Sequence, residues 1–122
     1  MSKTTCTYWN PLTPAHQHRW QWLDGLDGQV EQLILSHDPV TGEISRLTRF
    51  HPGADTQLFG ATVHDHPEEI LILSGHLWDE AFGMWLETGH YASRPPGEVH
   101  GPFRTEEGCL VLDLSFPQRS VE

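Results

Sequence analysis

The sequence predicts a small all-β domain, a sandwich or a barrel. Turn-forming residues are frequent, with 11 Gly and 9 Pro among 122 residues. Between them lie short apolar stretches of strand length, and none of these keeps the 3.6-residue period of an amphipathic helix. Many short strands at regular spacing are typical of all-β sandwiches and barrels. The length suits one domain, so we expect residues 1–122 to form a single domain.

The expected elements follow from these stretches in chain order. A short helical piece is expected around 14–22. The apolar stretches predict strands at 30–35, 44–50, 70–73, 81–86 and 110–116. Residues 38–42, Asp-Pro-Val-Thr-Gly, separate the first two strands and predict a hairpin turn. The last stretch mixes alternating and continuous apolar residues, as expected of a mostly buried strand.

Composition excludes two classes of partner. Lys and Arg number 7 and Asp and Glu 17, so the net charge is −10, and no basic cluster is present to bind nucleic acid. No apolar run approaches the roughly 20 residues that span a bilayer, and the first residues lack the apolar core of a secretory signal. Cys6 and Cys109 are isolated, which favours free thiols and a cytoplasmic location. A single disulfide between them is the alternative.

The most informative stretch is His64-Asp65-His66-Pro67-Glu68, which runs directly into Ile70-Leu71-Ile72-Leu73. Alternate residues of a strand share a face, so a continuous strand places His64, His66 and Glu68 on one side, followed by Ile70 and Ile72. Imidazole nitrogens and a carboxylate oxygen suit Fe(II), Mn(II), Zn(II), Ni(II) or Co(II). The alternative is a pair of surface histidines on an edge strand.

A second stretch, GHYASRPPGEVH at 89–100, strengthens the metal hypothesis. Its Pro-Pro-Gly turn brings His100 to a fixed offset. The two stretches together resemble the cupin motifs G(x)5HxH(x)3,4E(x)6G and G(x)5PxG(x)2H(x)3N. Glu68 is followed by six residues and Gly75, and Gly89 by five residues, Pro95-x-Gly97, two residues and His100.

Over about 30–116 the chain is similar to the cupin domains of zinc-binding, ChrR-type anti-sigma factors and their single-domain relatives. The resemblance implies a double-stranded β-helix, or cupin jelly roll, and a divalent transition metal held by His64, His66, His100 and Glu68. It also implies a homodimer. One residue, instead of three or four, lies between His66 and Glu68. This shortening keeps strand parity, but it is also compatible with a site of three histidines alone.

Other polar residues have two interpretations each. Tyr91, just before the second motif, is a candidate proton donor, and Glu68 a candidate general base. Glu31, Arg46 and Arg49 lie in early predicted strands. A side chain of this kind that points inward needs a partner, and a substrate carboxylate or enolate would supply one. The alternative is a set of outward salt bridges.

Two functions follow from the resemblance. The first is a metal-dependent enzyme acting on a small oxygen-rich substrate, such as a dicarbonyl or hydroxyketone, by dioxygenase-type cleavage or by enolate-forming isomerase or lyase chemistry. The second is a non-catalytic metal-containing sensor or small-ligand-binding cupin. The sigma-binding zinc domain of the anti-sigma factors has no counterpart in residues 1–30, which contain only Cys6 and no matching His/Cys set.

Overall fold

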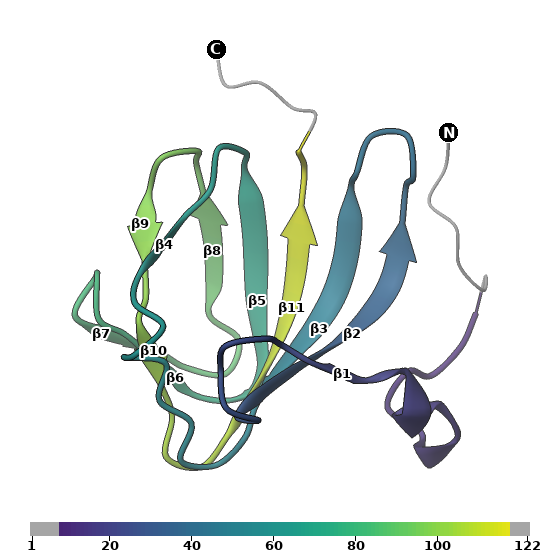
Figure 1. Ribbon diagram of the computed structural model, residues 1–122, viewed down its shortest axis with the longest axis horizontal. Coiled ribbons are helices and arrows are strands. Elements are labelled where there is room, and N and C mark those ends of the chain that lie inside the picture. The colour runs from purple at the N-terminus through teal and green to yellow at the C-terminus, as the bar shows by residue number, and fades with distance from the viewer. Residues whose placement is uncertain (1–7, 118–122) are drawn as a thin grey trace.

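The computed structural model describes residues 8–117, and the fold within this range is all-β, as predicted (Figure 1). A short 3-10 helix, η1, spans Pro14–Arg19. The strands are β1 (Gln21–Trp22), β2 (Val30–His37), β3 (Ile44–Phe50), β4 (Thr62–Val63), β5 (Glu68–Gly75), β6 (Leu77–Asp79), β7 (Met84–Leu86), β8 (Tyr91–Arg94), β9 (Val99–His100), β10 (Phe103–Arg104) and β11 (Cys109–Ser115). Cys6, predicted to be a free thiol or to form a disulfide with Cys109, lies outside the described residues.

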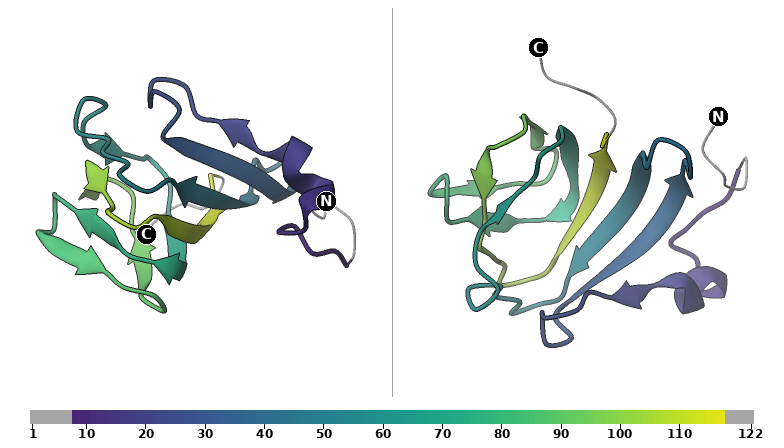
Figure 2. Two further views of the ribbon diagram at one scale, coloured as in Figure 1. Left: turned by 90° about the horizontal axis from the view of Figure 1, so that it is seen from below. Right: turned by 45° about the horizontal axis from the view of Figure 1, so that its top comes forward.

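Most strands belong to one large sheet. Its order is β1-β2-β3-β11-β5-β8, while β10-β6-β7 and β4-β9 form two smaller sheets. Figures 1 and 2 show the large sheet curving, with the short strands gathered beside its β5 and β8 side. β11 pairs antiparallel with both β3 and β5, although it follows them by many residues. It is therefore the strand that joins the early and middle parts of the chain.

The hairpin predicted at 38–42 is present between β2 and β3. The Asp38 carboxylate accepts hydrogen bonds from the backbone N–H groups of Val40 (2.9 Å) and Thr41 (3.3 Å). Gly42 has φ of +78°, a conformation that costs least at glycine. This turn chemistry fixes the β2–β3 register, which runs from Val30 opposite Phe50 to the turn.

The core lies against the inner face of the large sheet. On β11 every second residue is buried, so that Cys109, Val111 and Asp113 face inward. Glu68, Ile70 and Ile72 of β5 are buried in the same alternation, as the sequence pattern predicted. Buried core residues shared by the sheets are Leu26, Val30, Phe50, Ala54, Ile70, Ile72, Leu77, Leu86, Cys109 and Val111.

Two expectations about strand extent were wrong. The strand expected at 81–86 begins only at Met84, because Ala81 donates its N–H to the Asp79 carboxylate (3.1 Å) in a turn. The chain also bends at 65–66, and β5 begins at Glu68. His64 and Glu68 therefore do not lie on one continuous strand. The proline at 67 ends the local pairing, and the metal-site geometry arises from tertiary contacts instead.

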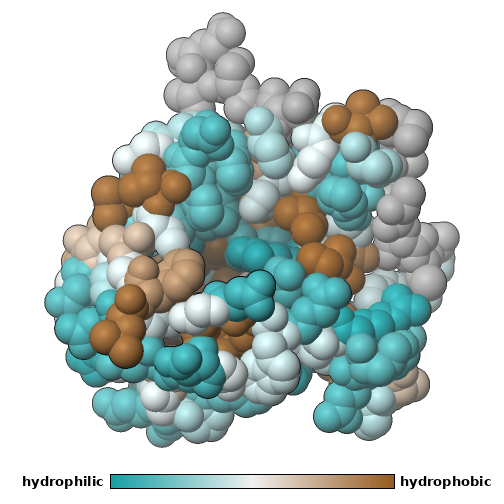
Figure 3. Space-filling model, in the orientation of Figure 1, coloured by the Kyte–Doolittle hydropathy of each residue, from teal (hydrophilic) through white to brown (hydrophobic). Residues whose placement is uncertain are grey.

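The surface shows no single dominant apolar face in the view of Figure 3. Apolar side chains there form separate groups among hydrophilic ones. Large exposed hydrophobic residues include Leu58, Tyr8 and Val40. Scattered exposure of this kind is normal for a protein surface.

Candidate metal centre and pocket

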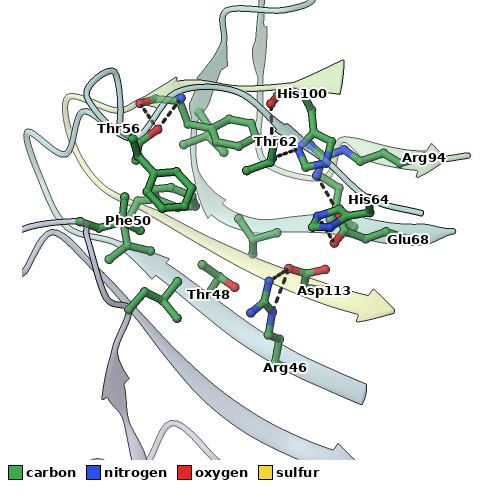
Figure 4. A pocket seen from close by; sticks show the side chains of 18 of the residues that line it. Arg46, Thr48, Phe50, Thr56, Thr62, His64, Glu68, Arg94, His100 and Asp113 are labelled. Carbon is green, nitrogen blue, oxygen red and sulfur yellow. Dashed lines mark hydrogen bonds and ion pairs between the residues drawn. The ribbon is translucent and has the colours of Figure 1, made fainter. Parts of the chain in front are cut away.

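A cavity of about 160 Å³ lies on the inner face of the large sheet. Its floor is apolar, with Phe50, Ile70 and Val111 from three adjacent strands and Leu77 and Phe103 from the smaller sheet. Its charged side chains and its two histidines gather at one end, as Figure 4 shows. An apolar pocket with a few converging polar groups is the usual form of a small-molecule site.

Three potential metal ligands meet at that end. The donor atoms of His64, Glu68 and His100 all lie within 4.8 Å of one another. The antiparallel pairing of β4 with β9 sets Thr62 opposite His100 and carries His64 to the same end. The Gly97 N–H also donates to the His64 carbonyl (2.9 Å), so the proline-rich turn is tied to the first motif. Nε2 of His64 lies 3.7 Å from Oε2 of Glu68.

His100 has the hydrogen bonding of a metal ligand. Its Nδ1 lies 3.1 Å from the Thr62 hydroxyl, and that hydroxyl also donates to the His100 carbonyl (3.4 Å). Both bonds are satisfied together when Nδ1 carries the proton, which leaves the Nε2 lone pair free. Nε2 is buried and has no hydrogen-bond partner. Burial, and secondarily Arg94, lowers the pKa of His100 to about 4, so the ring is neutral near pH 7.

Glu68 is held as a buried ion pair. Arg94 Nη1 donates to Oε1 of Glu68 at 2.9 Å, and the two residues are only 7% and 3% exposed. Burial by itself raises the pKa of Glu68, but Arg94, with His64 and His100, outweighs burial and leaves that pKa below its usual value. The carboxylate is therefore ionised, with Oε2 on the histidine side. Oδ2 of Asp79 lies 3.9 Å from Nη2 of Arg94.

The donor set fits a divalent transition metal. Neutral imidazoles and an ionised carboxylate are the ligands that such ions take, and the unpartnered Nε2 of His100 lacks any other acceptor or donor among the described residues. Three protein ligands leave coordination positions open, which is typical of catalytic or ligand-binding sites.

His66 lies next to this group but outside it. Its ring centroid is 5.1 Å from that of His64, and its Nδ1 is 3.0 Å from the Asp65 carboxylate. The chain bends at 65–66, and the cluster of donor atoms within 4.8 Å consists of His64, Glu68 and His100 without His66. Pro67, which lies between His66 and Glu68, is the sequence signal for this break in the strand phase.

Tyr91 lies outside the pocket lining. It is 54% exposed on β8, and its hydroxyl donates to the Glu69 carboxylate, which also faces outward. This hydrogen bond raises the pKa of Tyr91. The outward phase follows from the β5–β8 register, in which Tyr91 pairs with Leu71. Proximity to a motif in sequence therefore did not place the side chain in the site.

The charged residues of β2 and β3 lie on both faces of the large sheet. Arg49 and Glu31 pair on the outer side of the sheet at 3.1 Å, which is the salt-bridge alternative. Arg46 instead lines the pocket and donates through Nε to Asp113 (3.1 Å). Burial and then Glu68 raise the pKa of Asp113 to about 6, against the opposing effect of Arg46.

The polar residues of this pocket that sequence reasoning missed are Thr48, Thr56, Thr62, Arg94 and Asp113. For Asp113 a signal was available, because a carboxylate interrupts the apolar run Leu-Val-Leu-Asp-Leu. An acidic residue at an inward position of a buried strand needs a partner. Asp113 is therefore a candidate site residue for the same reason as Arg46.

This fold, with a histidine–glutamate cluster at one end of a β-sandwich pocket, defines a cupin jelly roll. The family comparison agrees: residues 12–115 match the model of the ChrR cupin-like domain. The chain belongs to this family.

Solved structures with a similar fold are of several kinds. KdgF from Halomonas sp. is 25% identical, with a TM-score of 0.66 over 86% of this chain and 91% of that one. An acetylacetone dioxygenase from Acinetobacter johnsonii is 15% identical, with a TM-score of 0.71 over 95% and 78%. A chain in the complex of Rhodobacter sphaeroides SigE with the anti-sigma ChrR is 25% identical, with a TM-score of 0.59 over 80% and 49%.

Relatives among the curated proteins and membrane-spanning helices were both sought. No match was found among the curated proteins. Within residues 8–117, no helix has the length and apolar character needed to cross a membrane.

Proposed function

We propose that this chain is a metal-dependent cupin enzyme whose pocket takes a small oxygen-rich substrate such as a dicarbonyl or hydroxyketone. His64, Glu68 and His100 hold a divalent transition metal, and His66 is the predicted fourth ligand. The observation that carries the proposal is the buried, unpartnered Nε2 of His100, which lies with the donor atoms of His64 and Glu68 inside one pocket.

A divalent metal held by His64, Glu68 and His100 would supply Lewis acidity for enolate-forming chemistry, or redox chemistry with dioxygen if it is iron. The protein residues supply the rest. Thr62 orients the His100 ring, and Arg94 keeps Glu68 ionised, so that Glu68 either completes the ligand set or accepts a proton from the substrate. The apolar floor excludes water. A cavity of about 160 Å³ admits a molecule of about six to eight non-hydrogen atoms.

A metal-containing sensor or small-ligand-binding protein is the second candidate. It is favoured by the match to the ChrR cupin-like domain, since the ChrR in the similar structure is an anti-sigma factor in complex with SigE. In this case the same three residues hold the metal, but the ligand that enters the pocket is not converted.

The metal site is tested by metal analysis of the purified wild type and of His64→Ala, His100→Ala, His66→Ala and His18→Ala. His18 is exposed and distant from the cluster in sequence, so it serves as the control. We expect about one equivalent of metal in wild type and His18→Ala. Loss of one ligand from a site worth about 10–16 kcal/mol over four ligands costs about 2.5–4 kcal/mol and weakens binding roughly 70- to 900-fold. Equal metal in wild type, His64→Ala and His100→Ala would refute the site.

Enzyme and sensor are separated by turnover. Protein loaded with iron and given acetylacetone or a small hydroxyketone is followed by oxygen uptake and by product analysis under anaerobic conditions. Conversion that depends on His100 supports the enzyme. If the protein binds the same compounds saturably but converts none of them, whichever common divalent metal it is loaded with, the result supports the sensor.

The homodimer and the cytoplasmic location stay predictions. Size-exclusion chromatography with light scattering of the full chain tests the former, with twice the 13.9 kDa chain mass as the expected result.

A further inference from the structure

A second polar group lines the same pocket but belongs to neither motif. Thr48 of β3 and Asp113 of β11 are each only 6% exposed, and each carries an oxygen that is buried without a hydrogen-bond partner. Five such side-chain atoms occur among the described residues, and three of them line this one pocket. The third is Nε2 of His100, which the proposed metal accounts for.

Unpaired buried polar atoms cost free energy, so their concentration in one cavity needs a cause. The strand register places Arg46 opposite Asp113 and Thr48 opposite Val111. Thr48 and Asp113 are therefore diagonal neighbours on the inner face, with Cβ atoms separated by about 7–8 Å or less. A single ligand hydroxyl between the two side-chain oxygens fills such a span.

Arg46 fixes the Asp113 carboxylate in place. Its Nε and Nη2 both contact Oδ2, at 3.1 and 3.0 Å, and its Nη1 donates to Gln32 (2.8 Å). The other oxygen, Oδ1, is the one without a partner. Figure 4 shows Asp113 between Arg46 and Glu68 on the sheet wall of the pocket.

The charges select the kind of group that binds there. Arg46 balances Asp113, as Arg94 balances Glu68, so this wall carries no excess positive charge. A ligand carboxylate would lie against the Asp113 carboxylate and be repelled. A hydroxyl instead donates to Oδ1 of Asp113 and accepts from the Thr48 hydroxyl, which satisfies both orphaned atoms.

We propose, on the basis of the proposed function, that Thr48 and Asp113 bind a second hydroxyl group of the substrate, on the sheet wall of the pocket beside Glu68. The substrate class is then a small hydroxyketone with a second hydroxyl, rather than a simple dicarbonyl or a keto acid. Arg46 is a positioning residue that acts through Asp113.

The test uses Co(II)-loaded full-length protein and two ketones that differ in one group, 1,4-dihydroxybutan-2-one and 1-hydroxybutan-2-one. Binding is followed by the visible absorption of Co(II), which reports occupancy without turnover. We expect wild type to bind the dihydroxy compound at least 10-fold more tightly. Thr48→Val and Asp113→Leu should reduce this ratio to about 1–2 without changing the metal content or the affinity for the monohydroxy compound.

Thr48→Val is the decisive variant because it keeps the side-chain shape. Since its hydroxyl has no partner in the protein, its removal should not lower the unfolding midpoint. Thr105→Val is the matched control: Thr105 is buried, outside the pocket lining, and bonded to His76 and Gly108. It should lower the midpoint and keep the selectivity of wild type.

Three results would overturn the inference. Wild type that carries full metal but does not distinguish the two ketones, or binds neither, shows that this wall does not recognise a hydroxyl, while the metal site stands. If both Thr48→Val and Asp113→Leu keep the selectivity of wild type, these two side chains do not bind the hydroxyl. Protein that takes up no metal overturns the proposed function together with this inference.

Discussion

Replacing Arg94 by Met tests whether the buried ion pair with Glu68 holds the metal end of the pocket together. The guanidinium is lost, but a long apolar side chain remains to fill the space. The Glu68 carboxylate, 3% exposed, is then left without its 2.9 Å partner. Removing one member of a buried pair costs about 3–5 kcal/mol. For 122 residues at ~2.1 cal/mol/K each, this lowers the midpoint of thermal unfolding by about 12–20 °C.

The double variant Glu68→Gln/Arg94→Met isolates the interaction. With both charges gone no unpaired ion remains, so the double variant should be more stable than Arg94→Met alone, with a coupling of about 2–3 kcal/mol. Urea unfolding followed by tryptophan fluorescence, in EDTA, measures each corner of the cycle. Arg104→Met is the control, because Arg104 is exposed and stacks only on Trp78 and Trp85. It should cost about 1 kcal/mol or less.

Metal addition gives a second readout of the same pair. A divalent cation next to Glu68 replaces the charge that Arg94 supplied, so added metal should stabilise Arg94→Met more than it stabilises wild type. A single-variant cost below about 1 kcal/mol, or a cycle with no coupling, would show that Arg94 does not control the charge state of Glu68.

Three further predictions concern Thr62, Asp113 and Gly75. Thr62→Val removes the hydroxyl that orients His100, and should weaken metal binding about 10–100-fold in chelator competition with little change in stability. Asp113 has a folded pKa of about 6, raised from 3.8, so its contribution to stability is full below the unfolded pKa and is lost as the pH rises through 6. Wild type should therefore lose about 2.4 kcal/mol relative to Asp113→Asn between pH 4 and 7 in EDTA, measured by urea unfolding at each pH; parallel curves would contradict this. Gly75→Ala places a Cβ 2.0 Å from the Gly108 carbonyl oxygen and should cost more than about 3 kcal/mol, whereas Gly97→Ala meets nothing within 4 Å and should cost only about 1–2 kcal/mol for its positive φ.

The parts of the fold that depend on local pattern could be predicted from the sequence. The strand expected at 44–50 coincides with β3, and the hairpin at 38–42 is present because its Asp and Gly satisfy the turn directly. The predicted inward alternation of Glu68, Ile70 and Ile72 is also confirmed, because these residues lie on one eight-residue strand. The periodicity of a long strand and the residue types of a turn predict these elements without knowledge of the rest of the fold.

The rest depends on pairing between distant segments. β4, β9 and β10 have two residues each, too few for any period to show. Yet the pairing of Thr62 with His100 is what brings His64 to the cluster. Arg94 is not distinguishable by residue type from a surface charge, and only the register of β8 turns it inward.

The proposed metal ligands and the proposed hydroxyl site have different structural support, and this difference determines which of them can change independently. The proposed metal ligands come from short strands and a bend, and hydrogen bonds such as those of Thr62 and Gly97 hold them. Thr48 and Asp113 stand on β3 and β11, which pair along seven residues at the centre of the large sheet. A side-chain change on these central strands leaves the backbone pairing intact. Substrate preference can therefore vary at positions 48 and 113 while the metal end, and the chemistry that depends on it, stays the same.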